Sequence, residues 1–215
     1  MESQQLKIFL IFNNKKVKKI LIVKIIKRIP SNTLRVFFYK WLLNYNIGHN
    51  VKIGRSLINC NTLTVGDNVI IRHNNTISCD LFSVGSNTKI HSGNTIVGKS
   101  SFSIGENSRI INDHFIDLWN NVTIGNNTWI SGRGSQFWTH GSIHTKKGTK
   151  DLGINIKDNV YISSNTSISP GVTIENDNLV GLGSVISKSI LTKRNIVAGN
   201  PAMVVKQNVD WRENW

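Results

Sequence analysis

The most constraining feature of the sequence is a six-residue rhythm between Ile154 and Lys188, where an aliphatic residue returns at every sixth position. A helix repeats every 3.6 residues and a strand every 2, so neither explains this spacing. Six residues match one short side of a triangular parallel β-solenoid, and three such sides close about one coil. We expect the aliphatic side chains to point inward and to stack on counterparts about eighteen residues away. They are Ile156, Ile162, Ile168, Ile174, Val180 and Ile186.

A looser form of the repeat begins at Ile47, where Val-Gly or Ile-Gly pairs mark the coils. The pairs that begin at residues 65, 84, 104 and 124 lie nineteen or twenty residues apart, so each early coil is expected to contain a residue or two of bulge. Because glycine tolerates a positive φ, we expect these glycines to take that conformation at tight corners. The predicted fold class is an all-β solenoid, a parallel β-helix, with a helical segment before it.

Residues 1–46 differ from the rest of the chain, because lysines interrupt the apolar runs Leu6–Phe12 and Ile20–Ile26. Neither run approaches the roughly 20 apolar residues that a membrane span requires. Ser31 before an apolar stretch is typical of a capped helix. We expect this segment to cover the open end of the first coil as a lid; the alternative is a basic amphipathic anchor on an anionic membrane.

Length and charge limit the remaining possibilities. A chain of 215 residues suits one domain with an appendage. Its formal charge of +14 favours an acidic partner such as a cofactor phosphate, an anionic polysaccharide, nucleic acid or an anionic membrane. The abundance of Lys, Ile and Asn offers the plainer explanation of coding bias.

The two cysteines, Cys60 and Cys79, lie nineteen residues apart, which places them at similar positions in neighbouring coils. We expect them to be reduced core residues. The chain has no cysteine and histidine cluster with zinc spacing and no signal-peptide cleavage site, so the cytoplasm is the expected compartment and no metal site is predicted.

The rhythm stops between Ile130 and Ile154, so we expect residues 131–153 to leave the coil as a long loop, of the kind that is usually functional or disordered. The loop contains Trp138-Thr139-His140 and, four residues later, His144. After the regular coils, Ala198–Met203 contains Gly-Asn-Pro, which predicts a turn that ends the solenoid, with a polar tail at 207–215.

The hexads, the Trp-Thr-His-Gly loop and the closing Ala-Gly-Asn-Pro-Ala together resemble the hexapeptide-repeat acyltransferases, in particular sugar and polysaccharide O-acetyltransferases. The resemblance covers roughly residues 47–206. It implies a left-handed β-helix, a homotrimer, and acetyl-CoA bound along the groove between two subunits. It also implies that a loop histidine, here His140, is the general base that takes the proton from a sugar hydroxyl. His144 is the rival candidate.

The same resemblance implies residues that bind acetyl-CoA. Tyr161 and Ser164 should line the pantetheine groove, Leu182 should contact it edge-on, and Ser187 and Lys188 should approach the CoA end. Lys206 resembles the residue that reaches the nucleotide phosphates, with Lys193 and Arg194 as weaker candidates. Tyr161 stands where the family often has tryptophan, and Met203 where it often has a basic residue.

A break in the repeat at residues 112–119 supplies candidates for the acceptor site. Asp113 and Asp117 can each accept a hydrogen bond from a sugar hydroxyl or cap a turn, and Asp117 can instead orient the catalytic histidine. Trp138 and Trp119 either stack on a sugar ring or pack in the core.

The leading hypothesis is acetyl transfer from acetyl-CoA to a hydroxyl of an anionic surface saccharide, such as a capsule or lipopolysaccharide unit, by an enzyme in the cytoplasm or at the inner face of the membrane. Nucleic acid is not expected as its partner. The alternatives are N-acetylation of an amino sugar or antibiotic, a solenoid carbonic anhydrase, which would need histidines from adjacent coils on zinc, and a non-catalytic module that binds a polyanion.

Overall fold

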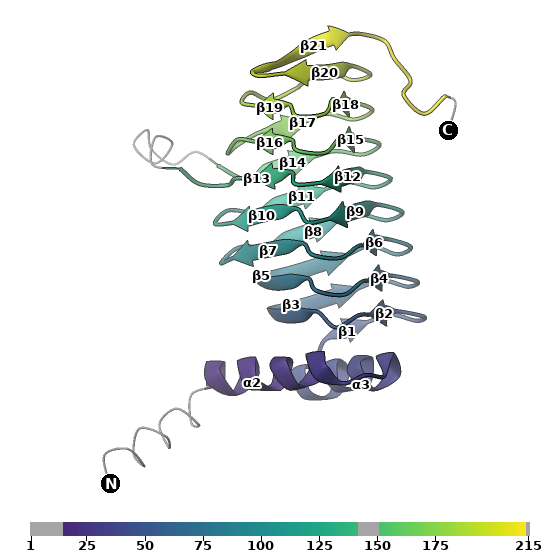
Figure 1. The fold of residues 1–215 in the computed structure, drawn as a ribbon, viewed down its shortest axis with the longest axis vertical. Helices are drawn as coiled ribbons and strands as arrows, with labels where there is room; N and C mark the ends of the chain where they lie inside the picture. Colours follow the sequence, from purple (N-terminus) through teal and green to yellow (C-terminus); the bar gives the residue numbers. More distant parts are fainter. Residues whose placement is uncertain (1–14, 142–150, 214–215) are drawn as a thin grey trace, which may run out of the picture.

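The computed structural model describes residues 15–141 and 151–213. It shows two N-terminal helices followed along the chain by a parallel β-solenoid of about eight coils (Figure 1). The coil is a left-handed β-helix, which confirms the predicted fold class. Each coil has three faces. In chain order they are called face 1, face 2 and face 3. The first corner is the turn that follows face 1, the second corner follows face 2, and the third corner follows face 3 and leads into the next coil.

The strands of each face lie in register and hydrogen-bond from coil to coil. Face 1 contains β1 (Asn46–Ile47), the second half of β3 (Leu57–Val65) and of β5 (Thr76–Val84), β8 (Phe102–Ile104), β11 (Val122–Ile124), β14 (Ile154–Ile156) and β17 (Thr173–Ile174). Face 2 contains β2 (Lys52–Ile53), β4 (Ile70–Ile71), β6 (Lys89–Ile90), β9 (Arg109–Asn112), β12 (Trp129–Arg133), β15 (Tyr161–Ile162), β18 (Leu179–Val180) and β20 (Ile196–Gly199). Face 3 contains the first half of β3 and of β5, then β7 (Thr95–Gly98), β10 (Phe115–Leu118), β13 (Gln136–Phe137), β16 (Ser167–Ile168) and β19 (Val185–Ile186).

The core is a continuous column of inward side chains. All six aliphatic residues of the hexad rhythm are buried, which confirms their predicted direction. The cysteines are confirmed as buried, free and in register, with their Sγ atoms 3.5 Å apart.

The first corner corrects the expectation about glycine φ. The positive φ belongs to the asparagine two residues after each of the glycines 48, 66, 85, 105 and 125, with φ between 52 and 61° at Asn50, Asn68, Asn87, Asn107 and Asn127. The glycines are required for another reason. A Cβ at Gly105 would lie 2.8 Å from the backbone nitrogen of Asn126 in the next coil, so the close passage of that coil excludes a side chain.

The excursion from the coil begins later than predicted. Residues 131–137 remain in the solenoid, because β12 continues to Arg133 and β13 pairs with β10 and β16. The apparent break at Ile130 is a bulge with positive φ at Gly132 and Gly134, after which Phe137 fills the core position with an aromatic ring in place of an aliphatic side chain. The chain therefore departs after β13, directly beside Trp138-Thr139-His140.

The N-terminal helices cover the first coil, as the lid prediction required (Figure 1). They are α2 (Lys15–Arg28) and α3 (Asn32–Leu43), and the side chain of Ser31 caps α3 by accepting a hydrogen bond from the Leu34 nitrogen. From α3, Arg35 Nε donates to the Ile53 carbonyl at 2.8 Å, and the Tyr39 hydroxyl donates to that of Ser56 at 3.3 Å. The open strand edge of the first coil is thereby satisfied.

At the other end the Gly-Asn-Pro turn joins β20 to β21 (Ala202–Lys206) in an antiparallel hairpin, so the predicted turn does end the parallel stack. The tail then folds back onto the first corner, where Trp211 Nε1 donates to the Asn159 carbonyl at 3.0 Å.

Candidate active site

The candidate site lies at the third corner, where the chain leaves β13 for the excursion. His140 Nδ1 lies 2.7 Å from Asp117 Oδ2, and Asp117 belongs to β10 of the preceding coil. The Asp117 side chain is 11% exposed and that of His140 is 44% exposed. The carboxylate is therefore anchored inside the wall while the imidazole reaches solvent.

Thr139 fixes Asp117 from the same turn. Its backbone nitrogen donates to Asp117 Oδ2 at 3.0 Å and its hydroxyl donates to the same oxygen at 2.7 Å. Burial by itself would raise the pKa of Asp117, but the hydrogen bonds from Thr139 and His140 outweigh it, so the pKa lies below its ordinary value. Asp117 is thus an anion that accepts three hydrogen bonds on one oxygen.

This arrangement determines the tautomer of His140. An ionised carboxylate can only accept, so Nδ1 must carry the proton in the hydrogen bond to Asp117. Nε2 of the neutral ring then has a free lone pair on the solvent side. Of the roles that the sequence left open for Asp117, the geometry supports the orientation of the histidine.

Trp119 and Lys99 lie beside the imidazole. The Trp119 ring centroid is 5.4 Å from that of His140, and Lys99 Nζ lies 3.7 Å from the centre of the Trp119 ring. Asn120 secures the turn, since its Nδ2 donates to the Thr139 carbonyl at 2.7 Å. The site therefore presents a base, a half-exposed aromatic surface and a cation at one corner.

The other predicted acceptor residues lie apart from the histidine. Asp113 has a positive φ at the second corner, before β10 begins, and its Oδ2 is 3.9 Å from Arg133 Nη2. Asp113 and Asp117 are four positions apart along the chain that leads into β10, a span of about 13 Å. Trp138 lies on the outside of face 3, with its ring 5.0 Å from Phe115 and its Nε1 donating to Gln136.

The predicted acetyl-CoA residues occupy four regions of a single chain. Tyr161, on face 2, donates its hydroxyl to Ser131 at 2.8 Å and meets the ring of Trp211 edge-on. Ser164 and Leu182 lie at the second corner of successive coils, where Leu182 is 72% exposed. Ser187 and Lys188 lie at the third corner after β19, and Lys206 ends β21.

Residues 142–150 lie outside the described part of the chain, and so does the prediction for His144. Within residues 15–141 and 151–213, no group of three or more His, Cys, Asp or Glu side chains is placed to hold a metal ion.

Sequence reasoning did not select Thr139, Asn120 or Lys99. Their signal is the coil length of nineteen or twenty residues, because Asp80, Lys99, Trp119 and Thr139 follow one another at that interval. Such a register predicts that these residues gather at one corner. There Ser100 Oγ donates to the Trp119 carbonyl and the Asn120 nitrogen donates to the Thr139 hydroxyl, although the bulge lengthens the next step so that Phe115 stands opposite Gln136.

Comparison with known proteins finds similarity to acetyltransferases. The chain is 30% identical to galactoside O-acetyltransferase of Escherichia coli strain K12 over 107 residues, which are 50% of this chain and 51% of the relative. Over this segment the chain is similar to a sugar O-acetyltransferase. The matched segment spans about half the length of that relative, and no family model matches the hexapeptide-repeat chain.

Two solved structures match the chain at low identity. A hexapeptide-repeat acetyltransferase from Vibrio cholerae superposes with a TM-score of 0.49 at 18% identity, covering 89% of each chain. A polySia-specific acetyltransferase superposes with a TM-score of 0.44 at 21% identity, covering 78% of this chain and 83% of its own.

Proposed function

We propose that the protein transfers an acetyl group from acetyl-CoA to a hydroxyl of a saccharide, and that residues 47–206 carry this activity. The observation that carries the proposal is the 2.7 Å hydrogen bond between His140 Nδ1 and the buried carboxylate of Asp117. It leaves Nε2 as an oriented base at the surface, which is what deprotonation of a hydroxyl requires. The similarity to a galactoside O-acetyltransferase supports the hydroxyl as acceptor and acetyl-CoA as donor.

In the proposed reaction, His140 Nε2 removes the proton from the acceptor hydroxyl as its oxygen attacks the thioester carbonyl. The C–S bond then breaks, and the CoA thiolate leaves with the proton that His140 returns. Asp117 stabilises the imidazolium that exists between these steps. No covalent enzyme intermediate is needed, and the base ends in its starting state.

Two further features favour a saccharide that carries negative charge. Trp119 is 49% exposed beside His140 and offers a flat apolar surface on which a sugar ring can stack. The formal charge of +14 would attract an anionic acceptor and raise its encounter rate. Trp138 and Asp113 remain predicted acceptor contacts, further from the base.

We propose that acetyl-CoA lies between subunits of a homotrimer, in contact with Tyr161, Ser164, Leu182, Ser187, Lys188 and Lys206. Their spread over separate corners of one chain fits a groove that two chains complete, and the high exposure of Leu182 gives a neighbouring subunit a surface to cover. Light scattering should then give three times the mass of the chain. A monomer would contradict this part of the proposal.

Activity of a His140→Ala variant tests the reaction. Loss of a general base should lower the rate of thiol release from acetyl-CoA by roughly 10²- to 10⁴-fold, while His49→Ala, a histidine change in the first coil, should not. Paired acceptors with hydroxyl or amino groups separate O-acetylation from N-acetylation. Near-native turnover by the His140 variant would contradict the assignment, and saccharide binding without thiol release by the native protein would favour the non-catalytic alternative.

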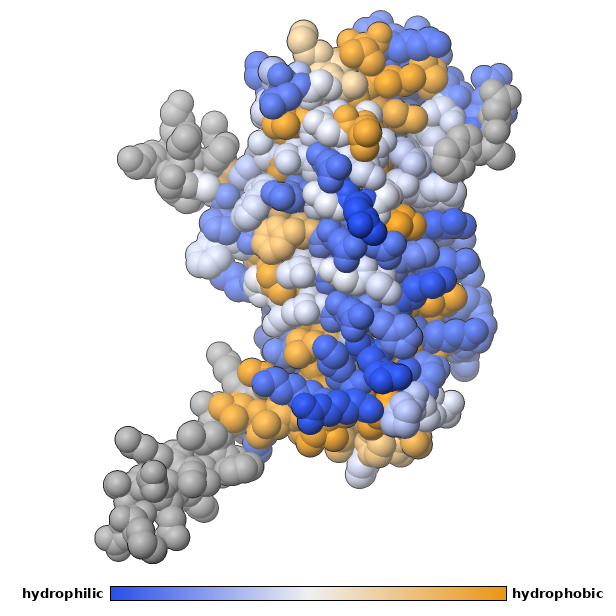
Figure 2. All heavy atoms as spheres, viewed as in Figure 1, coloured by the Kyte–Doolittle hydropathy of each residue, from blue (hydrophilic) through white to orange (hydrophobic). Residues whose placement is uncertain are grey.

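The outer side of the helices suggests where the protein works. None of the described helices is long and apolar enough to cross a membrane. Exposed apolar residues, including Ile25, Phe37 and Trp41, gather there next to basic residues, as the neighbouring orange and blue of Figure 2 show. We propose that this face contacts an anionic membrane and keeps the enzyme at the inner face of the bilayer.

A further inference from the structure

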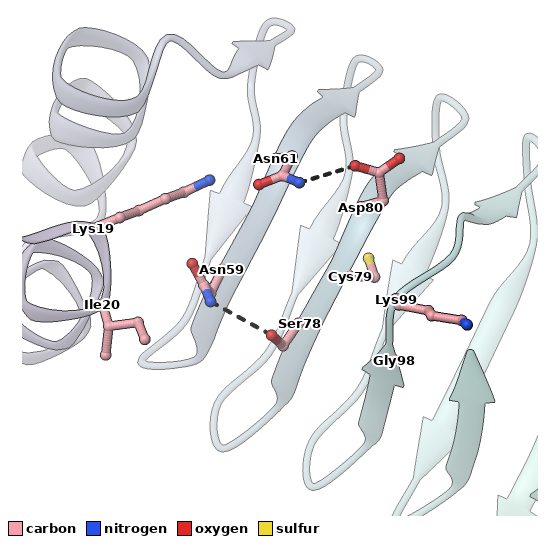
Figure 3. A pocket seen from close by; sticks show the side chains of 9 residues that line it. All are labelled: Lys19, Ile20, Asn59, Asn61, Ser78, Cys79, Asp80, Gly98 and Lys99. Carbon is pink, nitrogen blue, oxygen red and sulfur yellow. Dashed lines mark hydrogen bonds between the residues drawn. The ribbon is translucent and has the colours of Figure 1, made fainter. Parts of the chain in front are cut away.

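A cavity opens at the third corner, between the helices and the coil that precedes Trp119 (Figure 3). It has a volume of about 280 Å³. Its wall combines apolar surface, to which Ile20 and Cys79 contribute, with side-chain amides, a hydroxyl, a carboxylate and two lysines. The lining includes Lys19, Asn59, Asn61, Ser78, Asp80 and Lys99.

Hydrogen bonds along the third corner link the wall of the cavity to the candidate active site. Asn61 Nδ2 donates to Asp80 at 3.0 Å, the Asp80 nitrogen donates to the Ser100 carbonyl, and the Ser100 hydroxyl donates to the Trp119 carbonyl at 2.8 Å. One coil further, Asn120 bonds Thr139. Coils repeat at about 4.8 Å, so His140 lies about 10 Å beyond Lys99 and about 20 Å beyond Asn61 along this edge.

The charges in the cavity favour a ligand with carboxylates. Lys19 and Lys99 both line the cavity beside the one carboxylate of Asp80, and the Lys99 ammonium stands at the edge toward Trp119. Lys19 Nζ already donates to the Cys60 carbonyl and keeps two further N–H groups. Lys99 has its side chain in the cavity and its ammonium over Trp119, so it links the two regions. Asn59 and Ser78 add neutral groups of the kind that bind sugar hydroxyls.

We infer that the acceptor is an extended acidic saccharide, with one unit at His140 and Trp119 and the following units in the Lys19–Lys99 cavity. This inference rests on the proposed acetyl transfer and names the size and charge of its acceptor. The proposed acetyl-CoA residues all follow His140 in later coils, whereas the cavity belongs to earlier coils. Donor and acceptor would therefore approach the base from opposite ends of the solenoid.

The test compares chain length, charge and the two lysines. Thiol release is measured with acetyl-CoA and four acceptors: a carboxylated hexasaccharide (oligogalacturonate or oligosialate), the matching monosaccharide, and a neutral hexasaccharide and monosaccharide of maltose type. Calorimetry measures binding of the same sugars without acetyl-CoA. The variants are the single change Lys19→Gln and the double change Lys19→Gln with Lys99→Gln. The control is the double change Lys52→Gln with Lys157→Gln, which removes the same charge at positions outside this cavity.

The native enzyme should prefer the carboxylated hexasaccharide to the other three acceptors. The cavity double variant should bind it about tenfold more weakly and lose most of the preference for length, because two exposed ion pairs are removed. The control should retain the native preference.

Thiol release that depends on neither chain length nor these lysines would overturn the inference and leave acetyl transfer intact. Loss of CoA affinity instead of saccharide affinity in the double variant would assign the cavity to the donor and would also overturn it. Lysine-dependent binding of the carboxylated hexasaccharide without thiol release would contradict acetyl transfer, while the cavity would stand as a saccharide site.

Discussion

At the residue scale, the chemistry of the site depends on one oxygen. Asp117 Oδ2 accepts from the Thr139 nitrogen, the Thr139 hydroxyl and His140 Nδ1 at 2.7 to 3.0 Å. Because Thr139 and His140 are adjacent, the carboxylate fixes the turn and the imidazole together. Asp117 is therefore a positioning residue, and His140 is the group that would touch the substrate.

Replacement of Asp117 by asparagine should separate positioning from folding. An amide oxygen in the place of Oδ2 keeps the hydrogen bonds from Thr139 but lacks the charge that stabilises the imidazolium. An amide nitrogen there would instead make Nδ1 accept and move the ring proton to Nε2, where it blocks the base. We expect kcat to fall by about 10²- to 10⁴-fold, with KM for acetyl-CoA and the melting temperature close to native. Steady-state kinetics and thermal unfolding measure these quantities.

Asp67→Asn, the same change at the first corner of an early coil, serves as the control and should leave kcat unchanged. A parallel fall of kcat and stability in Asp117→Asn would show that the carboxylate holds the fold and has no separate role in orienting His140.

At the element scale, buried polar side chains form a ladder up the inside of the second corner. Each side chain accepts a hydrogen bond from a backbone N–H of the next coil. The backbone N–H of Asn94 donates to Asn75 Oδ1, that of His114 donates to Asn94 Oδ1, and that of Ser135 donates to His114 Nδ1. His114 is the exception in this ladder, because its Nε2 has no hydrogen-bond partner among the residues that the structure describes. Burial lowers the pKa of His114 to about 4.

His114 should make the solenoid sensitive to acid. Its pKa in the folded chain lies below the ordinary 6.5, so between these values the unfolded chain binds the proton better. The free energy of unfolding should be at its full value above pH 6.5. It should fall as the pH drops toward about 4, and His114 accounts for roughly 3 kcal/mol of that fall.

His114→Asn continues the asparagine ladder and removes the titrating group, so its free energy of unfolding should vary less over this pH range. Urea unfolding at several pH values measures the slope. The comparison above pH 6.5 serves as the internal control, because both proteins are uncharged at this position there. An unchanged slope would contradict the role of His114.

The solenoid could be predicted from the sequence because its cause is local. An inward aliphatic residue recurs every six residues, which is the length of one side of the coil. The bulge at Gly132–Gly134 and the pairing of His140 with Asp117 were harder to predict. A seven-residue step from Ile130 to Phe137 looks like the end of the repeat, although the strand continues. The contact between His140 and Asp117 depends on the register between coils, which one sequence gives only to within a residue or two.

At the scale of the whole molecule, the two ends of the solenoid have different closures. The hairpin of β20 and β21 ends the stack at one end, and α2 and α3 cover it at the other (Figure 1). The helices bury Tyr39 and Ile26 against the coil, yet leave Ile25 65% and Trp41 69% exposed on their outer side. The role of the helices as a cover for the coil explains only the buried residues. The exposed apolar residues indicate that this face contacts a further apolar surface.

Vesicle binding tests that environment. The protein should sediment with vesicles of phosphatidylglycerol and phosphatidylcholine but not with phosphatidylcholine alone, and added salt should weaken the association because it screens the lysines of α2. Ile25→Ser combined with Trp41→Ser should reduce binding, since it removes apolar side chains that would enter the interface. Leu191→Ser with Val205→Ser, which removes exposed apolar residues at the opposite end, should not. Equal binding to neutral vesicles, or equal loss of binding in both variants, would contradict membrane contact through the helices. If the mass of the protein in solution, measured by light scattering, falls only in the helix variant, a second copy of the chain is the partner of this face.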